Sequence, residues 1–137
     1  MTKAKTRTFI ALEFASGLGL GLLGGFLFSY VDKSDLYYSV MFTFITIFAS
    51  SLTGIGLIGY LYLRQIEKKE DFGEAMILSF LGLILFLMLY ALLTALTSNL
   101  IAHYLSSVVL PILLPVTGAT IGFNYRRSKW NRQKMRN

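Results

Sequence analysis

Four long apolar segments occupy most of this 137-residue chain and constrain its fold more than any other feature. Leu36–Leu63 is a run of 28 residues without a charged side chain, and residues 8–30 contain a single charge, Glu13. No Asp, Glu, Lys or Arg occurs from Ala75 to Tyr125, and the polar residues 97–99 divide that run in two. About 20 consecutive apolar residues allow a helix to cross a bilayer core of about 30 Å. The sequence therefore predicts an all-α integral membrane protein with four transmembrane helices, near residues 8–30, 36–63, 74–96 and 101–125.

The composition supports the same fold class. The chain is 55% hydrophobic with a mean hydropathy of +0.61, outside the usual range of soluble domains. Because the four predicted spans use nearly all of residues 1–137, we expect one membrane domain and no soluble domain. The first apolar run is longer than the apolar region of a signal peptide, and no cleavage site follows it, so we expect no cleaved leader.

The basic residues are concentrated at three places. Three precede the first span, three lie in the central loop and six follow residue 125, whereas the first loop holds only Lys33 and the last loop holds none. The positive-inside rule then predicts both termini on the cytoplasmic side of a membrane of the bacterial inner-membrane type. The net charge of +6 therefore marks the cytoplasmic face and does not indicate a nucleic-acid partner. We expect residues of the basic tail, 126–137, to contact anionic lipid headgroups: Arg126, Arg127, Lys129, Trp130 and Arg132.

Small residues recur at helical spacing in the first and the fourth predicted span. Gly17, Gly21 and Gly25 share one face of the first span, and Gly118 and Gly122 share one face of the fourth. Such faces let helix backbones approach closely inside a membrane. Packing within the chain and a homodimer or partner interface are both compatible with this pattern. Two further residues of the fourth span, Pro111 and Pro115, predict a kink or a loosened helical turn.

Glu13 is the one carboxylate inside a predicted span, and it shares the face of Gly17. Ionisable residues inside membranes mark functional sites by default. Glu13 is therefore a candidate acceptor for a proton or a cation. The competing interpretation is an ion pair with Arg64, Arg126 or Arg127, all at the same predicted membrane face.

Residues that would indicate catalysis or cofactor binding are missing. The chain has no cysteine, which excludes disulfides, thiolate metal sites and cysteine catalysis, and its single histidine, His103, has no second ligand nearby in sequence. Serine-nucleophile, paired-carboxylate and phosphate-loop arrangements are also absent from the sequence. We therefore expect no enzymatic activity, no cofactor and no metal.

Two partial similarities concern the layout of the chain. Its size, its four predicted spans and an early membrane glutamate resemble the small multidrug resistance transporters, in which a first-span glutamate of each protomer exchanges protons for cationic drugs; Glu13 would be the matching residue. The charged central loop and the basic tail depart from that family. Phe72-Gly73-Glu74-Ala75 in a four-span chain resembles ATP synthase protein I, an assembly accessory. Neither similarity covers enough of the chain to assign a family.

Three functional hypotheses follow. In the first, the protein works through helix–helix association, as an accessory or assembly subunit of a membrane complex or as a homo-oligomer in the lipid bilayer. In the second, it is a small proton-coupled transporter or channel in which Glu13 titrates and the hydroxyls of Thr46, Ser50 and Thr53 line a path. In the third, it is a membrane immunity or phage-defence protein.

Overall fold

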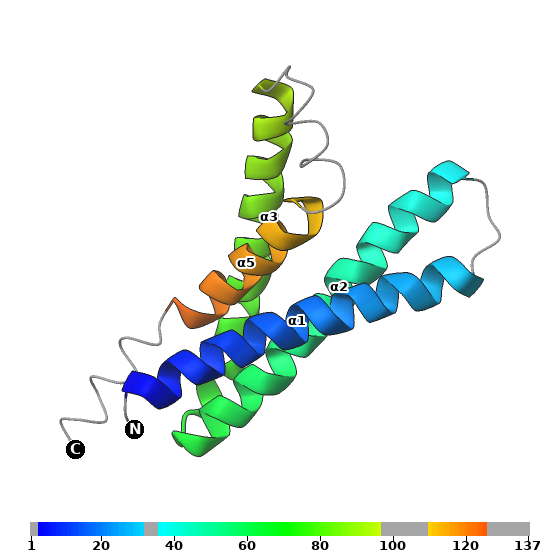
Figure 1. Cartoon of the computed structure of the whole chain (residues 1–137). Helices are drawn as coiled ribbons and strands as arrows, with labels where there is room; N and C mark the ends of the chain where they lie inside the picture. The colour runs from blue at the N-terminus through cyan, green and yellow to red at the C-terminus, as the bar shows by residue number, and fades with distance from the viewer. Residues whose placement is uncertain (1–2, 32–35, 97–109, 126–137) are drawn as a thin grey trace.

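The structure is a computed structural model that describes residues 3–31, 36–96 and 110–125 (Figure 1). The regular structure in these ranges is helical: α1 (Lys3–Val31), α2 (Leu36–Gln65), the 3-10 helix η1 (Lys69–Asp71), α3 (Phe72–Leu96) and α5 (Leu110–Asn124). Three of the four α-helices, α1, α2 and α3, are long and apolar enough to cross a membrane. The helix α5 has 15 residues, and residues 101–109 of the fourth predicted span lie outside the described residues. The prediction of an all-helical chain is confirmed to this extent.

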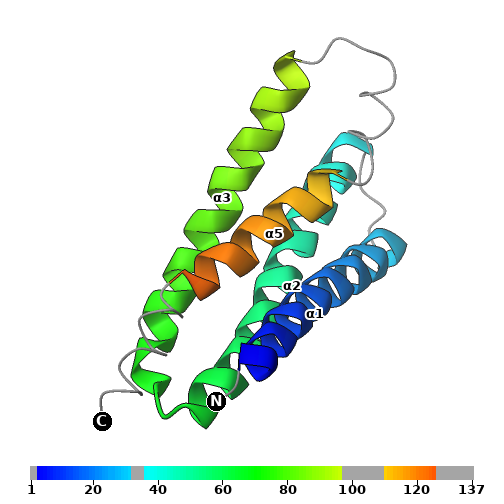
Figure 2. The same cartoon turned by 60° about the vertical axis from the view of Figure 1, so that its left-hand side comes forward.

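The helices form two hairpins. The helix α1 packs mainly against α2, and α3 packs mainly against α5. Figures 1 and 2 show that the hairpins meet at the end that carries the N-terminus, the α2–α3 connection and the last turn of α5. At the opposite end, α2 and α3 diverge (Figure 1).

The first hairpin depends on close backbone contact. Gly17, Gly21 and Gly25 lie in turn against three α2 residues, which are Ile55, Ser51 and Ile47. A Cβ atom at Gly21 would collide with the Ser51 hydroxyl and would lie 3.0 Å from the Ile47 carbonyl oxygen, so a larger residue requires Ser51 or the helix backbone to shift. The Ser16 hydroxyl donates a hydrogen bond of 2.9 Å to a backbone carbonyl of α2, that of Gly54.

The second hairpin uses the same kind of contact. Gly82 of α3 and Gly118 of α5 each face the other's carbonyl oxygen, and Gly122 faces the carbonyl of Leu78. The Ser79 hydroxyl is buried and donates a hydrogen bond of 2.9 Å to the Ala119 carbonyl. Because lipid offers no hydrophobic driving force between helices, close packing and such hydrogen bonds hold the pair together.

A tight turn ends α2 and leads to α3. The Lys68 amide donates to the Leu63 carbonyl at 2.9 Å, and the Glu67 amide donates to the Arg64 carbonyl at 3.3 Å. These two bonds define a Schellman motif, with Glu67 in the left-handed position at φ 59°. The motif satisfies carbonyls at the end of α2 and reverses the chain within a few residues.

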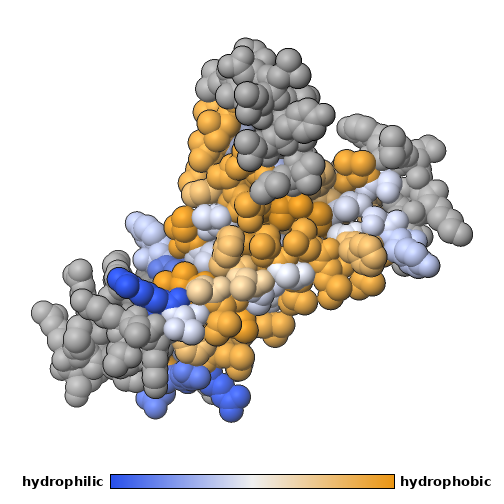
Figure 3. All heavy atoms as spheres, in the orientation of Figure 1, coloured by the Kyte–Doolittle hydropathy of each residue, from blue (hydrophilic) through white to orange (hydrophobic). Residues whose placement is uncertain are grey.

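The outer surface of the helices is apolar over most of their length. Figure 3 shows hydrophobic residues along the middle of the molecule, and strongly hydrophilic ones at the end where the N-terminus and the α2–α3 connection lie. Leu85 and Met88 of α3 are each 64% exposed, which is costly in water but suits a lipid or protein neighbour inside a membrane. This surface agrees with a membrane-embedded protein.

We predict that Gly21→Leu destabilises the protein by about 1–3 kcal/mol, because the larger side chain must displace Ser51 or separate α1 from α2. The matched control is Gly19→Leu, since Gly19 is exposed and a Cβ atom there meets no other group within 4 Å. Unfolding in detergent, followed by circular dichroism, measures both variants. Equal stability of the two variants would contradict the packing role of the Gly21 face.

Candidate functional site

The candidate site lies where the two hairpins meet, around Glu13. The Glu13 side chain is fully buried, at 0% exposure, in the first half of α1. It accepts a hydrogen bond of 2.5 Å from the Asn124 amide nitrogen, which belongs to the last residue of α5. The bond joins residues 111 positions apart and links the first hairpin to the second.

The orientation of the Asn124 amide follows from its second contact. Its Nδ2 atom also donates a hydrogen bond of 2.8 Å to the Thr120 carbonyl. A backbone carbonyl oxygen can only accept, so the atom that faces both oxygens is the nitrogen. The Glu13 oxygen is therefore an acceptor in this contact, and Asn124 Oδ1 is buried without a hydrogen bond to any described residue.

Aromatic rings and a glycine bring the helices together at this junction. The Phe9 and Tyr62 rings lie 5.2 Å apart within the first hairpin, and the Phe72 and Phe123 rings lie 6.4 Å apart within the second. The Tyr60 and Phe72 rings, 5.4 Å apart, form a contact between α2 and α3 across the junction. Gly59 of α2 faces the Phe123 ring, where a Cβ atom would collide with it. The hydrogen bond between Asn124 and Glu13 therefore forms at an end of the bundle that is closely packed and mainly apolar.

Three threonines of α2, two of which belong to the proposed path, form hydrogen bonds within their own helix. The hydroxyls of Thr43, Thr46 and Thr53 each donate to the carbonyl four residues earlier, at 2.7, 2.9 and 2.9 Å. A membrane helix commonly satisfies its threonine hydroxyls in this way. The hydroxyls thus have a structural explanation that requires no water-filled path.

The other residues that the sequence indicated as candidate packing, kink or binding residues lie in different parts of the structure. The glycines Gly17, Gly21 and Gly25 are covered by α2, and Gly118 and Gly122 by α3, so both faces are used inside the chain. Pro111 lies in the first turn of α5 and Pro115 lies in its interior, and both are buried. Arg64 is exposed at the end of α2. Outside the described residues lie Arg126, Arg127, Lys129, Trp130, Arg132 and His103.

Sequence reasoning missed Asn124 and the two serines that join helices, Ser16 and Ser79. Asn124 precedes the basic tail directly and resembles an ordinary residue of the membrane surface. A signal was nevertheless present: Asn124 and Glu13 are both polar and were both predicted near the same membrane face. The hypothesis of a basic partner for Glu13 did not include this uncharged donor, and two of its three candidates, Arg126 and Arg127, lie outside the described residues.

The site contains no recognisable set of metal ligands. Across residues 3–31, 36–96 and 110–125, no group of three or more His, Asp or Glu side chains is placed to hold a metal ion. Comparison with family models, with curated proteins and with solved structures found no match to this chain. Its function must therefore be inferred from its own geometry.

We predict that Glu13 and Asn124 are coupled in stability. Glu13→Met and Asn124→Leu should each destabilise the protein, because each leaves a buried polar group with one partner fewer. The double variant should recover much of the loss, with a coupling energy of about 1–3 kcal/mol. The measurement is the unfolding of all four proteins in detergent. If the stability lost in the double variant equals the sum of the losses in the two single variants, the contact contributes little to stability.

Proposed function

We propose that this protein is a multi-pass protein of the bacterial inner-membrane type that acts as an accessory or assembly subunit, by holding a transmembrane helix of a partner protein. The observation that carries this proposal is an apolar groove between the diverging hairpins, with a cavity volume of about 720 Å³. Its lining comes from three helices and consists of Met41, Phe44, Ile45, Phe48, Leu83, Leu87, Tyr90, Ala91 and Pro111.

The position of the groove favours a partner inside the membrane. Its α2 residues lie in the half of that helix away from the charged α2–α3 connection, and its α3 residues lie from the middle of α3 toward the end away from that connection. Ile45 is 53% exposed and Met41 is 42% exposed, so apolar area remains there to be covered. The glycine face of α1 is already covered by α2. Gly118 and Gly122 line a further apolar groove beside α3, but its cavity volume of about 560 Å³ is smaller than that of the groove proposed here.

Glu13 supports a structural role over transport. Its carboxylate is fully buried and bonded to Asn124, and the threonine hydroxyls of α2 are bonded to their own helix. A carboxylate that carries protons across a membrane needs access to water from both sides. The described surroundings of Glu13 offer packing and a hydrogen bond instead.

We predict that Ala91→Trp, which fills the groove, abolishes stoichiometric co-purification of a partner membrane protein in mild detergent. The matched control is Ile77→Trp, at a residue of α3 that is 63% exposed and lies outside the groove. The mass of the solubilised complex gives the readout. Retention of the partner by Ala91→Trp would contradict the proposed binding surface.

A second arm of that experiment tests transport directly. Reconstituted wild-type protein and Glu13→Gln are compared for proton flux into vesicles. The proposal expects the same background flux from both. If wild-type protein supports proton flux and Glu13→Gln abolishes it without changing the oligomeric state of the protein, the function is proton-coupled transport and not that of an accessory subunit.

We predict that both termini face the cytoplasm. Because the chain has no cysteine, single cysteines report their own side of the membrane. Ser34→Cys and Ser98→Cys, in the first and last predicted loops, should react with an impermeant maleimide from outside the cell. Thr2→Cys and Ser128→Cys should react only after the membrane is opened, and the reverse pattern would overturn the assigned orientation.

A further inference from the structure

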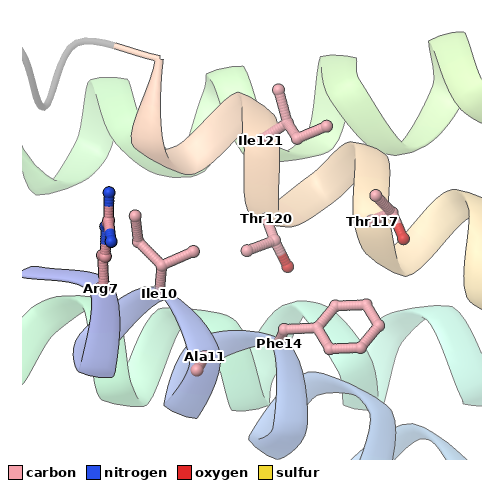
Figure 4. A pocket seen from close by; sticks show the side chains of 7 residues that line it. All are labelled: Arg7, Ile10, Ala11, Phe14, Thr117, Thr120 and Ile121. Carbon is pink, nitrogen blue, oxygen red and sulfur yellow. The ribbon is translucent and has the colours of Figure 1, made fainter.

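We infer that the groove between α1 and α5 binds one anionic phospholipid, with its phosphate at Arg7 and an acyl chain between the two helices. The groove is separate from the one proposed to hold a partner helix, and its cavity volume is about 380 Å³. Seven residues line it, four from α1 and three from α5: Arg7, Ile10, Ala11, Phe14, Thr117, Thr120 and Ile121 (Figure 4).

Arg7 lies at one end of the groove, and the rest of the groove is mainly apolar. In Figure 4, Arg7 lies at one end of the row of side chains, and Phe14 and Thr117 lie at the other. Arg7 and Phe14 are seven residues apart in a helix, which corresponds to about 10 Å along its axis. The groove therefore runs from the start of the apolar part of α1 toward the middle of the helix.

The two threonines leave the walls of the groove apolar. Thr117 donates its hydroxyl to the Leu113 carbonyl at 2.7 Å, and Thr120 donates to the Val116 carbonyl at 2.9 Å. Their hydroxyl donors are thus used inside α5. The remaining lining of Ile10, Ala11, Phe14 and Ile121 suits a hydrocarbon chain.

The positive charge of Arg7 at the end of the groove favours a lipid with an anionic headgroup. The Arg7 side chain is exposed and forms no hydrogen bond or ion pair with any residue in the described ranges. The nearest acidic residue along α1, Glu13, does not line the groove and is bonded to Asn124. A guanidinium binds a phosphate through two parallel hydrogen bonds, and basic pockets between membrane helices bind anionic headgroups.

An anionic lipid fits better than the alternatives. A zwitterionic lipid carries its own cation beside the phosphate, which competes with Arg7 for it. A free phosphate would use Arg7 but would leave the apolar groove empty. The inference requires only that α1 begins at a membrane surface, so it does not depend on the identity of a partner or on the orientation of the chain.

Native mass spectrometry of the full chain in detergent tests the site. Phosphatidylglycerol and phosphatidylcholine with the same acyl chains are added in equal amounts, and the retained lipids are counted. We expect wild-type protein to retain phosphatidylglycerol preferentially, and Arg7→Gln to lower that preference about fivefold. The control is Arg64→Gln, since Arg64 is also exposed and near the same end but lies outside the groove.

A second pair of variants tests the acyl chain. Ala11→Phe and Ala11→Leu place a larger side chain in the groove and should reduce retention of both lipids equally, with melting temperatures that show whether each variant is folded. Addition of glycerol phosphate should not displace the lipid, because it has no acyl chain. Unchanged preference in Arg7→Gln, or an equal loss in Arg64→Gln, would overturn the site in favour of diffuse attraction by the basic residues.

Discussion

The contact between Glu13 and Asn124 is the polar link between the two hairpins, and it lies at the end where α2, α3 and α5 share one apolar core. Within each hairpin, glycines allow long backbone contact between paired helices. Between the hairpins, contact is concentrated at one end, where a buried carboxylate meets an amide and Gly59 receives the Phe123 ring. Inside lipid, apolar side chains gain little by leaving the hydrocarbon, so directional hydrogen bonds and close packing decide which helices stay together. Joined at one end only, the hairpins diverge at the other.

Helix content was predictable from the sequence, whereas the pairing of the helices was not. Apolar runs of sufficient length predict α1, α2 and α3, because a backbone in lipid must satisfy its own hydrogen bonds. The face formed by Gly17, Gly21 and Gly25 was also visible, but its spacing is the same whether the neighbour is α2 or a second protein. For Asn124 the only signal was its predicted position at the same membrane face as Glu13, because its role arises from the crossing of α5 and α1, which no local pattern encodes.

The helices of the two hairpins are joined by the same kind of contact. In each, a serine of the first helix donates to a backbone carbonyl of the second, at 2.9 Å in both cases. Ser16 and Ser79 also each lie seven residues after a phenylalanine, Phe9 and Phe72, whose rings belong to the junction. A small polar side chain that reaches a neighbouring backbone permits close approach and adds a hydrogen bond at once. The hairpins therefore share this kind of contact, and the polar pair of Glu13 and Asn124 joins one hairpin to the other.

The geometry of the junction connects the two proposed binding sites. The helices α1 and α5 carry Glu13 and Asn124, and they also form the walls of the groove that ends at Arg7. A change in the distance between these helices alters both the hydrogen bond and the width of that groove. If it also changed the angle between the hairpins, the second groove, which is lined by α2, α3 and Pro111, would change in width as well. Binding in one groove and binding in the other would then be linked, and thermodynamic linkage requires each ligand to change the affinity of the other by the same factor.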